Sequence, residues 1–171
     1  MVKSWLLIAA VAGAGCALAG AAAADEGEGS LPNAGTDIND VGSLQRGARN
    51  FMNYCSGCHS LKYVRYNRMA KDLQIPETEL AKNLMFTSDK PFDTVNNSMP
   101  VDAEVWFGKQ PPDLSLMARS RSVDYIYAFL KGFYVDKTRP WGTNNLILPG
   151  AAMPAVLSDL QGLQRDRKSV V

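Results

Sequence analysis

Apolar side chains recur at helical spacing along most of the chain, whereas the alternating runs typical of strands are weak. The stretch after Asp40 predicts a helix with one apolar face, made by Val41, Leu44, Ala48, Phe51 and Cys55. Asp40 or Ser43 could cap its start. A later stretch begins at Ser122, also a capping residue, and its apolar face comprises Val123, Ile126, Tyr127, Leu130 and Phe133. The pattern predicts a mainly α fold, with helices at about 41–54, 61–73, 77–86, 102–108, 122–134 and 154–161.

Residues 1–24 have a different pattern, a continuous apolar run behind a positive charge at Lys3. Ala22 and Ala24 form an A-x-A site just before the acidic sequence DEGEG, which is typical of a cleaved export signal. The alternative is an uncleaved anchor, because Trp5–Ala24 is about long enough to span a membrane. We expect a signal peptide at 1–24, followed by an irregular leading arm at 25–41.

Composition and charge limit the function classes. The chain has 171 residues, 46% of them apolar, which suffices for one domain with its own core. A formal net charge of +1 provides neither the clustered basic charge of a nucleic-acid-binding protein nor a polybasic membrane signal. With residues 1–24 removed, Cys55 and Cys58 would be the remaining cysteines, in an oxidising compartment outside the cytoplasm.

Both of these cysteines and the chain's one histidine stand in NYCSGCHSLK, residues 53–62. A C-x-x-C pair can form a redox disulfide, supply half of a zinc site, or bind haem through thioether bonds. Zinc would lack a fourth soft or imidazole ligand, and a thioredoxin-like couple expects a preceding strand, not a helix. A histidine directly after the second cysteine is typical of c-type haem attachment. We therefore predict one covalent haem c per chain, with Cys55 and Cys58 as thioether links and His59 as the proximal iron ligand.

The other axial position of the iron would need a methionine, a water or an open site, because the chain has no second histidine. Met99 and Met153 lie in loop-like sequence beside a proline, whereas helical patterns contain Met52, Met69, Met85 and Met117. Met153 is favoured over Met99, because its loop, LPGAAMP, is rich in glycine and proline and is far from Cys58 in sequence. Ligation by His59 and Met153 fills both axial positions, which favours electron transfer over oxygen chemistry.

Several separate motifs also resemble one family. RGARNFMNYCSGCHSLKYVRYNRMAKDL, LMFTSDKPFDT, WFGKQPPDLSLMARSRSVDYIYAFLKGFYVD and RPWGTNNLILPGAAMPAVLSDLQG resemble the cytochrome c1 family of proteobacteria, nearly continuously from Gly42 to Gly162. That family is the haem c subunit of the quinol–cytochrome c oxidoreductase, the cytochrome bc1 complex. The resemblance implies a mainly α, class I-like cytochrome c fold with long irregular loops.

The resemblance further implies a role. The chain would be an electron-transfer subunit and not an enzyme by itself. It would accept an electron from the Rieske iron–sulfur protein and pass it to a soluble cytochrome c. It would be exported and would work beside cytochrome b at the periplasmic face of the bacterial inner membrane, without nucleic acid.

Site residues are implied as well. Met153, after the PG turn, corresponds to the distal ligand of the family. The segment PPDLS would pack near the haem, and an arginine shortly after it would contact a haem propionate. Arg119 and Arg121 are both placed for this contact, and the spacing favours Arg121.

The end of the chain departs from the family pattern. Residues 42–165 are expected to form the haem domain, truncated before the C-terminal helix and the membrane anchor of the family. In c-type cytochromes that helix packs against a glycine and an aromatic residue, which here would be Gly47 and Phe51. Residues 166–171 are interpreted as a non-native tail.

Other function classes stay open at this point. A free periplasmic mono-haem cytochrome c, a diffusing electron carrier, would explain the missing anchor. A vacant distal position would indicate a haem enzyme or a gas sensor, and a disulfide oxidoreductase is a further alternative. Copurification with cytochrome b would favour the membrane-complex subunit, and ready binding of carbon monoxide would favour the haem enzyme or gas sensor.

Overall fold

The computed structural model describes residues 31–97, 99 and 102–169. Its elements in chain order are α1 (Val41–Asn50), the π-helical η1 (Phe51–Cys55), β1 (Leu61–Arg65), α2 (Tyr66–Asp72), α3 (Glu77–Asn83), β2 (Thr94–Val95), α4 (Ala103–Phe107), α5 (Met117–Arg121), α6 (Val123–Lys131), β3 (Phe133–Val135), β4 (Thr143–Asn145), α7 (Ser158–Gln161) and the 3-10 helix η2 (Arg167–Ser169). The predicted signal peptide at 1–24 lies outside the described residues.

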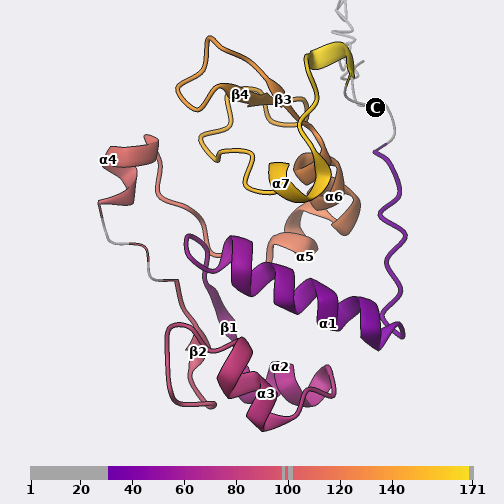
Figure 1. Ribbon diagram of the computed structural model, residues 1–171, viewed down its shortest axis with the longest axis vertical. Helices are drawn as coiled ribbons and strands as arrows, with labels where there is room; N and C mark the ends of the chain where they lie inside the picture. The colour runs from indigo at the N-terminus through magenta and orange to yellow at the C-terminus, as the bar shows by residue number, and fades with distance from the viewer. Residues whose placement is uncertain (1–30, 98, 100–101, 170–171) are drawn as a thin grey trace, which may run out of the picture.

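Helix α1 crosses the middle of the molecule in the view of Figure 1. On one side of it lie α2, α3 and the antiparallel pair β1–β2. On the other side lie α5, α6, α7 and the antiparallel hairpin β3–β4. Within the part of the chain that the structure describes, most residues in regular secondary structure are helical. None of these helices combines the length and hydrophobicity that a membrane span requires. The mainly α prediction is therefore confirmed at the level of fold class.

One predicted helix, 61–73, is wrong in its first half. Residues Leu61–Arg65 form strand β1, and α2 begins only at Tyr66. Leu61 pairs with Val95, and Arg65 pairs with Thr94 across an irregular register. The apolar positions of this segment suit either a helix or a strand, so the distant partner strand decides the outcome.

The remaining differences are smaller. The last predicted helix, 154–161, is reduced to α7, and its first residues form an irregular loop. Helix α5 and the β3–β4 hairpin were not predicted. In the hairpin, Phe133 pairs with Asn145 and Val135 pairs with Thr143.

The starts of α1 and α6, the two helices with predicted capping residues, are capped as predicted. The Asp40 carboxylate accepts a hydrogen bond from the Ser43 amide at 2.8 Å, and the Ser122 hydroxyl accepts one from the Tyr125 amide at 3.2 Å. The predicted apolar face of α6 is partly wrong, because the side chains of Val123 and Tyr127 are 43% and 39% exposed. The rest of that face is as predicted, because Ile126 and Leu130 are half-buried and Phe133 is buried. Ala128 is buried as well, and Phe129 makes an edge-on ring contact with Phe133.

The main core lies on the α2–α3 side of α1. It consists of buried side chains from several elements: Met52, Tyr66, Ala70, Leu80, Leu84 and Val95. Met69 and Met85 pack against this cluster, as predicted for core filler, and so does Phe51. Gly47 faces open space, since a Cβ atom built there meets nothing within 4 Å.

Two glycines should respond in opposite ways to a methyl group. At Gly132, which follows α6, an added Cβ would lie 2.8 Å from the Ala128 carbonyl oxygen and 3.4 Å from Asn145 Oδ1. We expect Gly132→Ala to lower the free energy of unfolding by about 2 kcal/mol, because the backbone oxygen cannot move aside without strain. Gly47→Ala, in the open middle of α1, should raise it by about 0.5 to 1 kcal/mol.

Urea unfolding of both variants beside the parent measures these differences. An equal response of the two glycines would contradict the packing described for Gly132.

Candidate haem-attachment site

The two cysteines and the histidine are presented by a tight turn at the end of the α1–η1 helix. The π-helical segment ends with a bond from the Ser56 amide to the Phe51 carbonyl at 3.0 Å. The amides of Cys58 and His59 then both donate to the Cys55 carbonyl, at 3.0 and 2.8 Å. Wide π turns within helices are frequent at functional sites, where they redirect side chains. Cys55, Cys58 and His59 are thereby held within one turn, all half-buried.

The two thiols do not have the properties of a redox couple. Burial raises the pKa of Cys55, and the negative charge of a Cys58 thiolate raises it further. Burial also raises the pKa of Cys58. Catalytic disulfide exchange needs a thiol with a lowered pKa, so that the thiolate is present at neutral pH. No disulfide joins Cys55 to Cys58 in the structure.

A zinc site does not fit the donor set either. In the described ranges, no group of three or more His, Cys, Asp or Glu side chains is placed to hold a metal ion. Cys55, Cys58 and His59 lack the fourth soft or imidazole ligand that structural zinc requires.

The ring of His59 is fixed by a backbone carbonyl from a distant part of the chain. Its Nδ1 lies 2.7 Å from the carbonyl oxygen of Pro112. A carbonyl oxygen can only accept, so Nδ1 carries the proton and donates it. In the neutral ring this leaves Nε2 with a free lone pair, the form that binds a metal. The histidine of the site therefore leaves Nε2 available to bind a metal.

The segment that supplies this carbonyl is attached to strand β1 by a series of hydrogen bonds. The Leu114 amide donates to the Ser60 carbonyl at 2.9 Å. The Asp113 carboxylate accepts from the amide of Lys62 at 2.9 Å, and the Ser115 hydroxyl accepts from the amide of Tyr63 at 3.2 Å. We call residues 112–115 the proximal segment. Its contacts hold PPDLS against the turn that carries His59. That PPDLS packs near a haem stays a prediction.

Asp113 is the charged residue of the proximal segment. Burial alone would raise its pKa, but hydrogen bonds from Ser115 and from the Lys62 amide outweigh it, so that the pKa of Asp113 is lowered. One carboxylate oxygen serves the Ser115 amide at 2.9 Å and the other serves the Lys62 amide. Asp113 thus joins the two chain segments that meet at His59.

A second side chain, Asn97, ties the turn to the end of β2. Its Nδ2 donates to the Cys58 carbonyl at 2.6 Å, and its backbone amide donates to the buried Ser60 hydroxyl at 2.9 Å. Sequence reasoning identified PPDLS but missed the specific roles of Asp113, Asn97 and Ser60. The only local signal was a polar Ser60 next to His59, because the partners lie more than 35 residues away.

The methionines fall into two groups, and Met117 lies outside the core that its helical pattern predicted for it. Met52 is in the core, and Met69 and Met85 pack against it. Half-buried positions outside that cluster are occupied by Met99, Met117 and Met153. Met153 lies in the irregular loop between β4 and α7, whereas Met117 begins helix α5. The assignment of Met153 as the distal ligand stays a prediction.

The arginines after the proximal segment lie on α5 and are both exposed. The Arg121 guanidinium stands over the Tyr125 ring, with its central carbon 5.5 Å from the ring centroid. This contact orients Arg121 along the start of α6. The propionate role of Arg121 stays a prediction.

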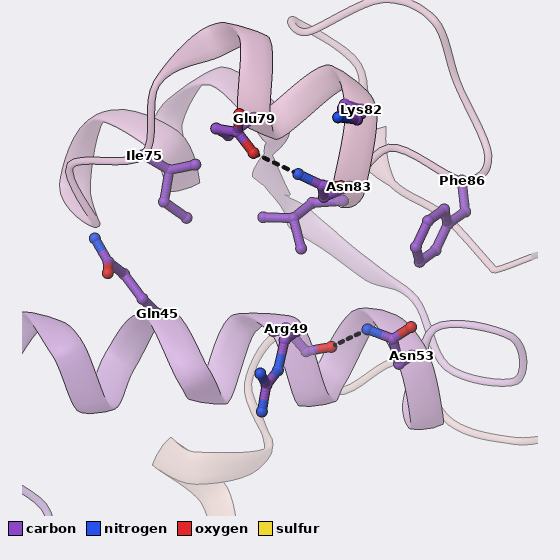
Figure 2. A pocket seen from close by; sticks show the side chains of 9 residues that line it. Gln45, Arg49, Asn53, Ile75, Glu79, Lys82, Asn83 and Phe86 are labelled. Atoms are coloured by element: carbon purple, nitrogen blue, oxygen red, sulfur yellow. Dashed lines mark hydrogen bonds between the residues drawn. The ribbon is translucent and has the colours of Figure 1, made fainter.

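An open groove of about 490 Å³ lies between α1 and α3, away from these residues (Figure 2). Gln45, Arg49 and Asn53 line it from the α1 side. Glu79 and Asn83 line it from α3 and hydrogen-bond to each other at 2.6 Å. The predicted haem and iron ligands are not among its lining residues, so the groove is separate from the candidate site.

Comparison with known proteins decides the family. A family model described as "Cytochrome C1 family" matches residues 34–167. The chain belongs to the cytochrome c1 family. This confirms the resemblance drawn from the sequence motifs, and membership supports a cytochrome c fold.

Individual relatives agree. Cytochrome c1 of Allochromatium vinosum is 56% identical over 135 residues, which are 78% of this chain and 55% of that protein. A protein of Nitrosomonas europaea named ammonia monooxygenase gamma subunit is 43% identical over 135 residues, which are 78% of this chain and 57% of that protein. Cytochrome c1 of Rhodospirillum rubrum is 32% identical over 150 residues, 73% of this chain and 55% of that protein. The chain spans little more than half the length of these curated relatives.

The proximal segment should contribute measurably to stability. Asp113→Asn replaces one acceptor oxygen by an NH2 group that faces a backbone amide. We expect it to lower the free energy of unfolding at pH 7 by about 1 kcal/mol, a modest value because the group is largely solvated. Since the pKa of Asp113 is lowered on folding, its ionised contribution is present above the unfolded pKa and is lost as pH falls through the folded pKa.

The difference between the parent and Asp113→Asn should therefore shrink below about pH 4. Urea unfolding at pH 7 and pH 3 measures it. Asp102→Asn serves as the control, because the Asp102 side chain makes no capping bond to α4. If the two variants lose the same stability at pH 7, the contacts of Asp113 do not hold the proximal segment.

Proposed function

We propose that this chain is the haem-carrying part of an electron-transfer cytochrome c1. Cys55 and Cys58 form the thioether links to one haem c, and His59 provides the proximal iron ligand. The observation that carries the proposal is the hydrogen bond from His59 Nδ1 to the Pro112 carbonyl at 2.7 Å. It leaves Nε2 unprotonated beside two thiols that are poorly suited to redox exchange. Family membership over residues 34–167 supports the same cofactor.

The haem, when bound, supplies a one-electron couple between ferric and ferrous iron. The chain's own residues determine how that couple is held. The Pro112 carbonyl keeps the proton on His59 Nδ1 and increases the donor strength of Nε2 toward a metal. Asp113 and Asn97 keep the two segments around His59 in place.

Met153 is proposed as the second axial ligand, with Met99 as the other candidate. A thioether opposite an imidazole favours the reduced iron and raises the potential relative to two imidazoles. It also closes the iron to small molecules. The half-buried loop after β4 supports this assignment of Met153, because the Asn144 side chain holds the Gly150 amide of that loop at 2.8 Å.

The complete protein is proposed to act in the cytochrome bc1 complex. It would accept an electron from the Rieske iron–sulfur protein, pass it to a soluble cytochrome c, and contact cytochrome b at the periplasmic face of the inner membrane. The names of the Allochromatium vinosum and Rhodospirillum rubrum relatives, both cytochrome c1, support this role.

Production of the chain in a bacterial host with c-type haem maturation tests the proposal. We expect one haem per chain in a pyridine haemochrome assay, with the absorption of two thioether bonds. Cys55→Ala or Cys58→Ala should shift this absorption to that of a single thioether. A colourless exported chain, or zinc bound at Cys55 and Cys58, would overturn the assignment.

The same holoprotein tests the distal ligand. Met153→Ala should abolish the near-infrared sulfur-to-iron charge-transfer band of the ferric protein and lower the midpoint potential by about 0.1 V or more. Met99→Ala and Met69→Leu should leave the band in place. Loss of the band in Met99→Ala alone would move the ligand to the other loop.

Arg121 is proposed to contact a haem propionate. A cation near a propionate stabilises its charge and couples it to the potential of the iron. Arg121→Gln should change the midpoint potential and its pH dependence more than Arg119→Gln, which alters the arginine two residues before it on α5. A larger effect of Arg119→Gln would transfer the role to Arg119.

A further inference from the structure

The loop between β4 and α7, which carries Met153, is irregular. Side chains bind both the amide and the carbonyl of one of its residues, Gly150. The Gly150 amide donates to Asn144 Oδ1 at 2.8 Å. The Gly150 carbonyl accepts from Arg139 Nη2 at 3.0 Å. Gly150 has φ +78°, a conformation that a larger residue adopts only with strain. The residue three positions before Met153 is thus bound through both of its backbone polar groups.

A carboxylate in the turn before β4 orients these side chains. Asp136 Oδ2 accepts from Asn144 Nδ2 at 2.9 Å, so that the other end of the amide, Oδ1, points to Gly150. Asp136 Oδ1 accepts from the amide and the hydroxyl of Thr138, at 3.0 and 2.6 Å. Hydrogen bonds from Thr138 and then Asn144, with a further contribution from the Arg139 charge, lower the pKa of Asp136. The carboxylate is therefore ionised at neutral pH.

Asn145 adds a second attachment point to the same loop. Its side chain is fully buried, with Nδ2 donating to the Phe129 carbonyl at 2.8 Å. Its Oδ1 accepts from the amides of Ile147 and Leu148, at 2.9 and 3.0 Å. The loop is therefore attached to the end of α6 at its beginning, and to Asn144 and Arg139 at Gly150. We call Asp136, Arg139, Asn144 and Gly150 the loop clamp.

This arrangement is more than is needed to close a hairpin. The β3–β4 ladder already pairs Phe133 with Asn145 and Val135 with Thr143. Asn144 Oδ1 accepts from the Asn145 amide within β4 at 2.9 Å, but the same oxygen and the Arg139 side chain also bind Gly150, outside the ladder. Their effect is to restrict the positions that the chain can take just before Met153.

We propose that the loop clamp positions Met153 and sets how strongly its thioether competes for the sixth ligand position. This inference rests on the proposed function, with Met153 as distal ligand. Asp136, Arg139 and Asn144 act on the loop backbone and are positioning residues. A looser loop would hold the thioether at lower effective concentration, so that an external ligand displaces it more easily.

Titration of the ferric holoprotein with imidazole, followed by loss of the near-infrared sulfur band, tests the proposal. In Asn144→Asp, the amide that donates to Asp136 becomes a second carboxylate facing the first. We expect imidazole to displace the thioether at roughly tenfold lower concentration, as for the loss of about one hydrogen bond. Asn83→Asp is the matched control, since Asn83 also donates to a carboxylate, Glu79, but on α3.

The double variant Asp136→Asn with Asn144→Asp provides the rescue. It reverses the direction of the same hydrogen bond and keeps an acceptor for the Gly150 amide. We expect its imidazole affinity to return to within about threefold of the parent. A general loss of stability would not be reversed by this exchange, whereas loss of positioning would.

Thr138→Val is the milder variant should Asn144→Asp fail to load haem. It removes only the hydroxyl that bonds Asp136 Oδ1, in an exposed turn. We expect imidazole to bind about threefold more tightly, and the Gly150 amide to exchange its hydrogen faster. An affinity equal to that of Asn83→Asp in these variants would overturn the proposal.

The Met153→Ala variant distinguishes failure of the proposed ligand assignment from failure of the proposed loop clamp. If it keeps the sulfur band, the proposed ligand is wrong and the inference falls with it. If it loses the band while Asn144→Asp and Thr138→Val bind imidazole like the parent, Met153 is the ligand and the loop clamp alone is refuted.

Discussion

The hydrogen bond from His59 Nδ1 to the Pro112 carbonyl is the interaction on which the site depends. His59 follows Cys58 directly, so the turn fixes its backbone, but the turn alone leaves the ring free to rotate. The carbonyl, from a segment 53 residues away, removes that freedom and selects the tautomer. A ring that is both oriented and, when neutral, unprotonated at Nε2 follows from this single contact. The rest of the proximal side serves to keep Pro112 in place.

The turn that carries His59 and the loop that carries Met153 are held in the same way, by polar side chains that bind backbone groups. On the proximal side, Asp113 and Asn97 bind backbone amides and carbonyls of the turn. On the side of Met153, Asn144 and Arg139 bind the backbone of Gly150. Short polar side chains thus replace regular secondary structure in holding the loops. This explains how a chain with short helices and strands can hold two distant loops in defined positions.

The parts that the sequence predicted are those with local signals. The C-x-x-C-H spacing and the caps at Asp40 and Ser122 are each contained within a few residues. Strand β1 could not be predicted, because its apolar positions fit a helix until Val95 pairs with Leu61. The contact of Asp113 with Lys62 joins residues 51 apart, and no local pattern reports such a partner. Family resemblance located PPDLS near the site but not the atoms that bind.

The most direct test of the account is the protonation state of the His59 ring, measured by nitrogen-15 NMR of the holoprotein in its diamagnetic ferrous form. The account predicts a proton on Nδ1 that exchanges slowly with water, because the Pro112 carbonyl holds it, and no proton on Nε2. A proton on Nε2, or an Nδ1 proton that exchanges as fast as in a free imidazole, would contradict it.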